Sequence, residues 1–353
     1  MSAVLDALHA RRPDLAVDVF TGVPASFLDS SLAAPHRRIL SDTDVGMVQH
    51  GPFQSDLDAT ADAVTAFLDG LNEAADTAAA RMREAGCVVA LCDISPLGIV
   101  AAARAGIPAV LIENFRLDWI YAEVEDGPAL LREAGLRLAE IYRGAALHLQ
   151  VEPACDRVPG ARRIALPVAR AARRSREAAR AALGLGTHEP MVLVTTGGVT
   201  GEQRFVDALH ARPDIRFVVT GAPRSGTERN VTRIAHHDPL YLPDVIRASD
   251  GVVAKLGYST LAEVWREGRP FLRIPRSQWP EGPILSTWAA AHMTGFALDE
   301  QSFKSGAWVD RIDELLALPS NPSRDRAGQD DIAERVAQLL PVTRESRSAS
   351  ASP

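Results

Sequence analysis

A lysine followed by a glycine turn carries the residue types that suit a diphosphate group. Lys255 follows the apolar run 251–254, and Gly257 permits a tight turn before Ser259 and Thr260, which are common at helix N-termini. The free N–H groups at the start of a helix attract anions, and a neighbouring ammonium group strengthens that attraction. The segment therefore predicts a diphosphate-binding site.

Two glutamates lie where a carboxylate can accept hydrogen bonds from the hydroxyls of a ribose or another sugar. Glu263 falls one turn into the helix that follows the glycine turn, and Glu281 starts the next predicted helix, beside Gly282 and Pro283. Each glutamate also has a structural interpretation. Glu263 can complete a capping box with the preceding serine or threonine, and Glu281 can favour the positive end of a helix dipole. Their spacing alone leaves both interpretations open.

A second glycine turn supports the same prediction. Gly197 and Gly198 come at the end of the apolar run 191–196 and ahead of a helical pattern at 202–210. Glycines at such a turn let the backbone approach a phosphate closely. The alternative is steric, because a glycine is common wherever a strand turns tightly into a helix.

The first half offers candidates for binding a sugar or another flat ligand. In a chain that is only 5% aromatic, Phe115 and Trp119 lie close together, with Asn114 and Asp118 beside them. Aromatic rings stack on sugars and other flat ligands, and the polar neighbours can fix orientation. The alternative is that the rings close a hydrophobic core over the sheet.

Two residues of the first half are candidates for proton transfer. Asp93 follows the apolar run 87–92, and His50 lies in a loop rich in Gly and Pro ahead of the long helical pattern 58–85. A carboxylate or an imidazole at such a position can act as a general base. The structural alternative for the loop is that Asp56 caps the helix.

Composition excludes several classes of protein. A net charge of −7 and a pI of about 5.8 argue against a binder of nucleic acid, whose surface would be basic. Cys87, Cys92 and Cys155 are scattered, which indicates a reducing, cytoplasmic setting without disulfides or a zinc site. The adjacent histidines at 236–237 would point to opposite faces of a strand, so we expect no metal. No apolar run approaches the ~20 residues of a membrane span, and no signal peptide is evident.

Short apolar runs alternate with helical patterns through most of the chain, which predicts parallel sheets in an α/β fold. The Arg/Ala-rich segment 162–190 divides the series into two Rossmann-like halves. We interpret its arginines as a solvated helix face rather than a nucleic-acid patch. The predicted organisation is an N-terminal domain over 1–165, a C-terminal domain over 166–328, a helix over 329–340 and a disordered tail over 341–353.

Two long segments resemble a known family. They are DISPLGIVAAARAGIPAVLIENFRLDWIYAE (93–123) and ASDGVVAKLGYSTLAEVWREGRPFLRIPRSQWPEGPILSTW (248–288). Both are similar to motifs of a glycosyltransferase-like family that includes the amino-terminal domain of plant L-arabinokinase. The resemblance covers most of residues 15–320. It implies a GT-B-like fold, with two Rossmann-type domains facing a cleft. The lipid II-forming GlcNAc transferase and the UDP-glycosyltransferases are more distantly similar.

The resemblance also implies roles for the residues singled out above. The second domain would hold the donor, a nucleotide-diphospho-sugar, through the residues Gly197, Gly198, Lys255, Gly257, Ser259, Thr260, Glu263 and Glu281. The first domain would hold the acceptor, a small molecule or a component of the cell envelope. The implied activity is inverting glycosyl transfer that requires neither a metal nor a cofactor. The sequence does not identify the nucleotide, the sugar, the acceptor or the oligomeric state.

The chain departs from this family at its start. Family members begin with a strand and a G-H-G-x-G-H loop, whose His is the natural base, ahead of the first helix. Here Met1 falls where that helix begins, so we expect a first domain without its first strand. Asp93 and His50 then remain as base candidates, and we expect the C-terminal helix to pack on the first domain. A non-catalytic nucleotide-sugar-binding module or partner of a sugar kinase, and an epimerase of sugar nucleotides, remain as alternatives.

Overall fold

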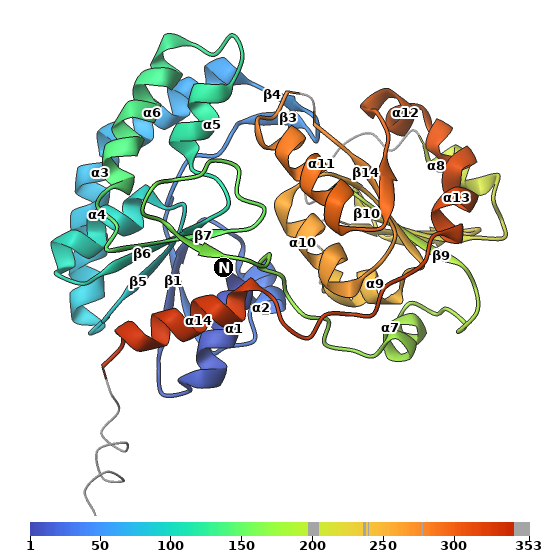
Figure 1. The fold of residues 1–353 in the computed structure, drawn as a ribbon, viewed down its shortest axis with the longest axis horizontal. Helices are drawn as coiled ribbons and strands as arrows, with labels where there is room; N and C mark the ends of the chain where they lie inside the picture. The colour runs from blue at the N-terminus through green and yellow to red at the C-terminus, as the bar shows by residue number, and fades with distance from the viewer. Residues whose placement is uncertain (197–204, 236–237, 239, 277, 342–353) are drawn as a thin grey trace, which may run out of the picture.

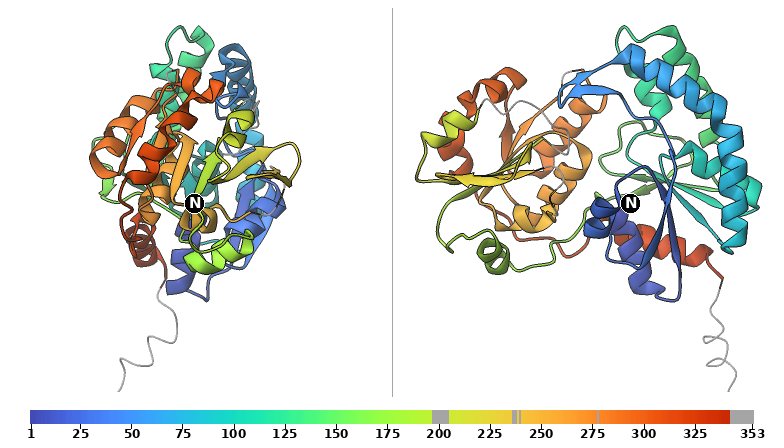
Figure 2. Two further views of the ribbon diagram at one scale, coloured as in Figure 1. Left: turned by 90° about the vertical axis from the view of Figure 1, so that its right-hand side faces the viewer. Right: turned by 180° about the vertical axis from the view of Figure 1, so that it is seen from behind.

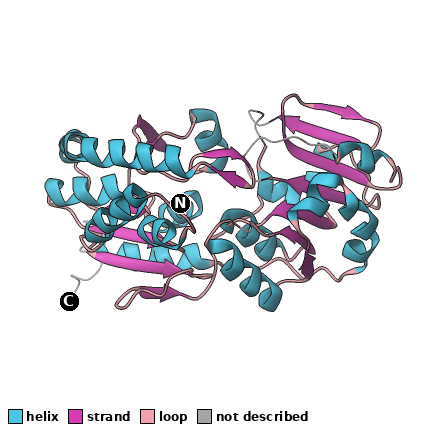
Figure 3. Cartoon of the chain, turned by 90° about the horizontal axis from the view of Figure 1, so that it is seen from above, coloured by secondary structure: helices cyan, strands magenta, loops and turns pink. Residues whose placement is uncertain are grey.

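The computed structural model describes residues 1–196, 205–235, 238, 240–276 and 278–341. Two α/β domains lie side by side, and a long segment links them (Figures 1 and 3). Gly197 and Gly198 lie outside the described residues, as does the C-terminal tail from residue 342 onward.

The first domain has its strands in separate sheets. Its elements in chain order are α1 (Ser2–Arg11), β1 (Val17–Thr21), α2 (Ala25–Ser31), β2 (His36–Leu40), β3 (Gln49–Gly51), β4 (Gln54–Ser55), α3 (Leu57–Glu84), β5 (Ala90–Asp93), α4 (Pro96–Ala105), β6 (Ala109–Glu113), α5 (Leu117–Glu123), α6 (Ala129–Tyr142), β7 (Leu147–Val151) and β8 (Arg162–Ile164). Strands β1 and β2 form one parallel pair, β3 and β4 form a hairpin, and β5-β6-β7-β8 form a parallel sheet.

Local sequence explains the helices that position the carboxyl end of this sheet. Ser95 accepts a hydrogen bond from the Gly98 N–H and so caps α4, whose first residue is proline, a favoured type there. Gly106 ends the same helix with a positive φ of 74°. Asp56 caps α3, because its side chain accepts a hydrogen bond from the Ala59 N–H. The Ser95 cap thus fixes the point at which the chain leaves the carboxyl edge of the sheet after β5.

The second domain has one continuous sheet. Its elements are α7 (Arg176–Ala182), β9 (Met191–Thr195), α8 (Val206–His210), β10 (Arg216–Ala222), β11 (Gly226–Glu228), β12 (Val231–Ala235), α9 (Leu242–Ala248), β13 (Gly251–Lys255), α10 (Tyr258–Glu267), β14 (Phe271–Ile274), α11 (Glu281–His292), β15 (Gly295–Ala297), α12 (Glu300–Ser305), the 3-10 helix η1 (Ala307–Arg311) and α13 (Ile312–Ala317). The strand order is β11-β12-β10-β9-β13-β14-β15, and every pairing except β11 with β12 is parallel. Every residue of β9 and β13 is buried, as expected for central strands.

The C-terminal helix α14 (Gly328–Leu339) returns to the first domain, as expected from the sequence. It lies against α1 (Figure 1), and Ile332 and Val336 share a core with Val4 and Leu8. Gln329 accepts a hydrogen bond from the backbone N–H of residue 169 in the linker, at 3.1 Å. The chain therefore crosses between the domains twice.

Two α/β domains built on parallel sheets confirm the predicted architecture of two Rossmann-like halves. The expected gap in the first domain is also present, because in the described chain β1 pairs with β2 alone and β5 with β6 alone. Within the described residues, no helix combines the length and apolar character needed to cross a bilayer.

Two of the linker arginines depart from the solvated face that the sequence predicted, whereas Arg162, Arg163, Arg173 and Arg174 are exposed as expected. Helix α7 is only seven residues long, and its Arg180 is 2% exposed, with Nη1 donating to the Ala248 carbonyl at 2.9 Å. Arg176 donates to the Ser249 carbonyl at 2.7 Å. A guanidinium presents several donors, so it satisfies carbonyls at the ends of buried elements that helix periodicity cannot reveal.

Candidate active site

A cavity of about 1370 Å³ extends from the inside of the first domain to the start of α10. Among the sequence-predicted residues, those that line it are Asp93, Asn114, Phe115, Ser259 and Glu263. They come from the carboxyl ends of β5 and β6 and from the first turns of α10. In open α/β sheets, ligands bind outside the carboxyl ends of the strands. The cavity is therefore the candidate active site.

Helix α10 begins without a side-chain cap. Gly257 is the N-cap residue and no side chain bonds to the first turn, so the helix leaves backbone N–H groups available for an anion. Ser259 is exposed and Thr260 is buried, both inside the first turn rather than at the cap. The capping-box interpretation of Glu263 is therefore wrong.

Lys255 ends β13, directly ahead of this helix start, and is 8% exposed. Burial lowers the pKa of its ammonium group to about 8, and the nearby Arg276 guanidinium acts in the same direction. Glu281 opposes the shift. The ammonium group is thus charged at neutral pH and lies in a position where few water molecules screen it.

Glu281 is held by Arg276, which follows β14. Arg276 Nη2 donates to Glu281 Oε1 at 2.5 Å, and both side chains are buried. Burial raises the pKa of Glu281, while Arg276 and Asn114 of the first domain lower it. Glu281 Oε2 is buried and has no hydrogen-bond partner within the described part of the chain. One oxygen of this carboxylate is therefore available to a ligand.

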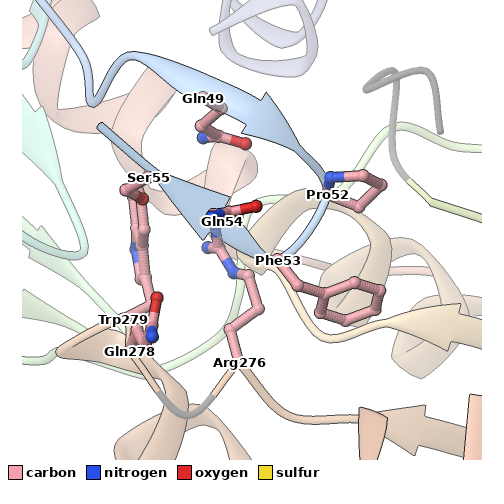
Figure 4. A pocket seen from close by; sticks show the side chains of 8 residues that line it. All are labelled: Gln49, Pro52, Phe53, Gln54, Ser55, Arg276, Gln278 and Trp279. Carbon is pink, nitrogen blue, oxygen red and sulfur yellow. The ribbon is translucent and has the colours of Figure 1, made fainter. Parts of the chain in front are cut away.

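The β3–β4 hairpin of the first domain contacts the segment that carries Arg276. Figure 4 shows a small hollow formed by Gln49, Pro52, Phe53, Gln54 and Ser55 on one side and Arg276, Gln278 and Trp279 on the other. The guanidinium carbon of Arg276 lies 3.9 Å from the centre of the Trp279 ring. The hairpin thus covers the second domain beside α11 (Figures 1 and 2).

Glu263 makes an ion pair that the sequence did not predict. Arg170 of the linker donates from Nε to Glu263 Oε1 at 2.6 Å and from Nη1 to Ser31 Oγ of α2 at 2.9 Å. Burial raises the pKa of Glu263, and Arg170 opposes that shift. Glu263 Oε2 is buried, with no hydrogen-bond partner among the described residues. The carboxylate therefore ties the linker to α10 and keeps one oxygen unengaged.

The two base candidates are far from equivalent. Asp93 lines the cavity, and its Oδ2 lies 3.3 Å from the terminal amine of Met1. His50 belongs to the hairpin, is exposed, and bonds through Nε2 to Asp56 at 2.8 Å. It does not line the cavity. The structure brings Asp93, and not His50, to the candidate site.

Two of the four candidate acceptor residues line the cavity, and the other two do not. Asn114 and Phe115 line the cavity. Asp118 forms an ion pair with Arg116 at 3.2 Å, and burial raises the pKa of its carboxyl. Trp119 packs against the core of the first domain. The core interpretation therefore holds for Trp119, whereas Phe115 packs against the same core and also lines the cavity.

Sequence reasoning missed three residues that organise the site. Arg276 and Arg170 hold the two glutamates, and the hydroxyl of Tyr258 accepts from the Val168 N–H at 2.9 Å and donates to the Glu152 carbonyl at 3.3 Å. Arg276 had a usable signal, because it lies two residues after the end of β14, whereas Arg170 had none. Among the described residues, no group of three His, Cys, Asp or Glu side chains is arranged to hold a metal ion.

Comparisons with known proteins agree with this architecture. No protein-family model matches the chain. It is 25% identical over 308 residues to L-arabinokinase from Arabidopsis thaliana, covering 86% of this chain and 29% of that protein. The chain thus spans less than a third of the length of this relative.

Solved structures of glycosyltransferases share the fold. The calicheamicin glycosyltransferase CalG4 superimposes with a TM-score of 0.59 at 15% identity, covering 100% of this chain and 95% of that one. SnogD from Streptomyces nogalater gives 0.56 at 17% identity, covering 96% of each chain. VinC, solved in complex with dTDP, gives 0.54 at 15% identity, covering 99% and 94%. The chain therefore has the fold of the GT-B glycosyltransferases.

Proposed function

We propose that this protein is an inverting, metal-independent glycosyltransferase that uses a nucleotide-diphospho-sugar as donor. The observation that carries the proposal is the buried Lys255 directly ahead of the uncapped N-terminus of α10. An ammonium group and free helix N–H groups together suit a diphosphate, and they can neutralise it without a cation. The similarity to glycosyltransferases in fold supports this proposal.

The donor would lie against the second domain. Its diphosphate would accept hydrogen bonds from the first turn of α10, near Gly257, Ser259 and Thr260, and would interact with the Lys255 ammonium group. The unengaged oxygens of Glu263 and Glu281 suit hydroxyls of the ribose and of the transferred sugar. Gly197 and Gly198 would add backbone contacts to the phosphates, a role that stays a prediction from the sequence.

The acceptor would lie against the first domain, at Asn114 and Phe115. Asp93 would take the proton of the acceptor hydroxyl while its oxygen bonds to the anomeric carbon and the bond from that carbon to the diphosphate oxygen breaks. Positive groups that face the leaving diphosphate stabilise the charge that develops on it. A base in one domain and a leaving-group site in the other favour attack from the opposite side, which inverts the anomeric centre.

The test is turnover of a panel of nucleotide-diphospho-sugars with hydroxyl acceptors, measured as release of nucleoside diphosphate in the presence of EDTA. We expect release that depends on both substrates, persists in EDTA and falls at least about a hundredfold in Asp93→Asn, since a general base contributes ~10²–10⁴-fold. Asn114→Ala is the companion variant, expected to raise KM for the acceptor. Loss of nucleotide binding in EDTA would contradict the metal-free mechanism.

A second candidate is a non-catalytic module that binds a nucleotide-sugar, or a partner of a sugar kinase. Its ground is the relative that the chain resembles: the similarity covers 86% of this chain but only 29% of L-arabinokinase, so the rest of that protein has no counterpart in the matched part. Tight donor binding without turnover of any donor in the panel would favour this candidate over the enzyme.

A further inference from the structure

The β3–β4 hairpin of the first domain is anchored in the second domain. The ring of Phe53, at the turn of the hairpin, packs against the core around Phe303, with the two ring centres 5.9 Å apart in an edge-on arrangement. Lys304 Nζ lies 5.8 Å from the centre of the Phe53 ring. Figure 1 shows the hairpin extending from the first domain toward α11. The position of the hairpin over the second domain is therefore set by contacts of the ring at its tip.

Trp279 makes the reverse contact. This residue lies between β14 and α11 of the second domain, yet its ring packs against the core of the first domain. The other face of its environment is Arg276, whose guanidinium carbon is 3.9 Å from the ring centre. Phe53 and Trp279 thus anchor the two walls of the hollow in Figure 4, each in the opposite domain.

Polar atoms on both walls of this hollow lack partners. Gln49 Oε1 on the hairpin, and Arg276 Nε and Trp279 Nε1 on the other wall, are buried without a hydrogen bond to any described residue. Figure 4 shows the side chains of Gln49 and Arg276 reaching toward the hollow from opposite sides. With the hairpin in this position, the hollow has no room for a water molecule. Buried polar groups are almost always paired, so three unpaired ones around one hollow indicate a site that a ligand completes.

The hollow is continuous with the proposed donor site through Arg276. Arg276 Nη2 donates to Glu281 Oε1 at 2.5 Å, and the same side chain lines the hollow. The charges of Arg276 and Glu281 also act on the ammonium group of Lys255, for which we proposed a diphosphate partner. A sugar attached to a diphosphate at Lys255 would therefore reach Arg276 and the hollow beside it.

The hollow offers hydrogen bonds and little net charge. The charge of Arg276 is paired with Glu281, and the remaining lining residues, Gln49 and Trp279 among them, are neutral. A hydroxyl group can accept from Arg276 Nε or Trp279 Nε1 and donate to Gln49 Oε1. A carboxylate would face a guanidinium that Glu281 already neutralises, so the cost of removing the carboxylate from water would not be offset.

We propose that the hairpin closes over the sugar of the donor, and that Gln49, with Arg276 and Trp279, selects a neutral sugar that bears free hydroxyl groups. This inference rests on the proposed function, because the diphosphate places the sugar. The hairpin moves away to admit the sugar and returns with Phe53 against Phe303. The sugar hydroxyls then accept from Arg276 Nε and Trp279 Nε1 and donate to Gln49 Oε1. Gln49 is thus a specificity-determining residue that the first domain supplies to a donor held by the second.

Titration calorimetry tests the proposal with UDP, dTDP, GDP and ADP, each alone and as its glucose and glucuronate derivatives. In the unmodified protein, the glucuronate derivative should bind at least about tenfold more weakly than the glucose derivative. Gln49→Met and Trp279→Phe keep the shape of the side chain and remove one polar group each. Each variant should weaken binding of the glucose derivative about fivefold and leave binding of the diphosphate alone unchanged.

Gln338→Met is the matched control, because Gln338 is exposed on α14, and it should change neither affinity. Hydrogen exchange of peptides that cover residues 47–56 should slow at least about fivefold with the glucose derivative, compared with the diphosphate alone. Equal affinity for glucose and glucuronate derivatives, an unchanged affinity ratio in both variants, or equal hairpin exchange with both ligands would overturn this proposal alone. Donor binding without turnover would contradict only the enzyme, since the affinity ratios are measured without turnover. A chain that binds none of these diphosphates would overturn both proposals.

Discussion

The second domain holds its strands in one continuous sheet, whereas the first domain divides them between separate sheets. The difference lies at one position, because β9 joins β10 to β13 and no described strand joins β1 to β5. Its effect on burial is large: β9 and β13 are entirely buried, and β1 is half-buried throughout. The neighbours of a central strand are thus buried where that strand is present, and they line a cavity where it is not.

The two domains also differ in the charges they bring to the candidate site. The carboxyl edge of the second sheet carries the cations Lys255 and Arg276, whereas that of the first carries Asp93 and Glu113. A cationic edge suits a diphosphate, and an acidic edge suits a base. This difference is consistent with the proposal that the second domain binds the donor and the first takes part in proton transfer.

The largest effect is expected from a charge in the middle of a central strand. Val253 of β13 is 0% exposed, so Val253→Asp should destabilise the protein by at least about 4 kcal/mol or prevent folding. Val19 has the same position in β1 but lines the cavity, so Val19→Asp should cost only about 1 kcal/mol. Urea denaturation measures both. Equal losses would mean that the two sheets do not differ in burial.

The next effect concerns the ion pair that ties the linker to α10. Glu263→Ala removes a buried carboxylate and leaves Arg170 without its charge partner, which should cost about 3 kcal/mol of unfolding free energy. Glu300→Ala is the control, because its pair with Lys304 is partly exposed and should contribute less than about 1 kcal/mol. Thermal denaturation compares them. If Glu263→Ala keeps its stability and loses only affinity for nucleosides, the carboxylate acts on the ribose alone.

A smaller effect is expected on diphosphate affinity. The chain has only two lysines, Lys255 and Lys304, so Lys304 provides the control for Lys255. Lys255→Met should weaken nucleoside diphosphate binding by ~1.5–3 kcal/mol, roughly tenfold or more, and leave nucleoside binding unchanged. Lys304→Met should change neither. Titration calorimetry provides the measurement, and equal losses for diphosphate and nucleoside would place Lys255 away from the phosphates.

The smallest effect is the pH dependence of that affinity. Because the pKa of Lys255 is lowered to about 8, the ammonium form dominates below this pH and is lost as the pH rises through it. Nucleoside diphosphate affinity should therefore be constant from pH 7 to 7.5 and fall by up to about tenfold by pH 9. The decline should be absent in Lys255→Met. An affinity that is flat to pH 9 in the unmodified protein would show that the charge does not act on the ligand.

Part of the site could be predicted because it depends on short segments. Lys255 and Gly257 lie between a strand and a helix that follow each other directly in the chain, so their position at the sheet edge was predictable. The helix predicted over 96–105 is α4, with its Ser95 cap. Local caps and hydrophobic periodicity act over a few residues, which is why these predictions agree with the structure.

Other features depend on pairs of residues far apart in the chain. Arg170 meets Glu263 across 93 positions, and the β3–β4 hairpin meets Arg276 across more than 200. No periodicity encodes such a pairing, because the linker and the hairpin take their positions only when both domains have formed. The sequence alone therefore determined the alternation of strands and helices, the two α/β halves and the glycine turn that follows Lys255. Only the tertiary structure decided that an arginine holds Glu263, and that Asp93 rather than His50 lines the cavity. The reason is that long-range packing and charge pairing select among side chains that the local sequence leaves equivalent.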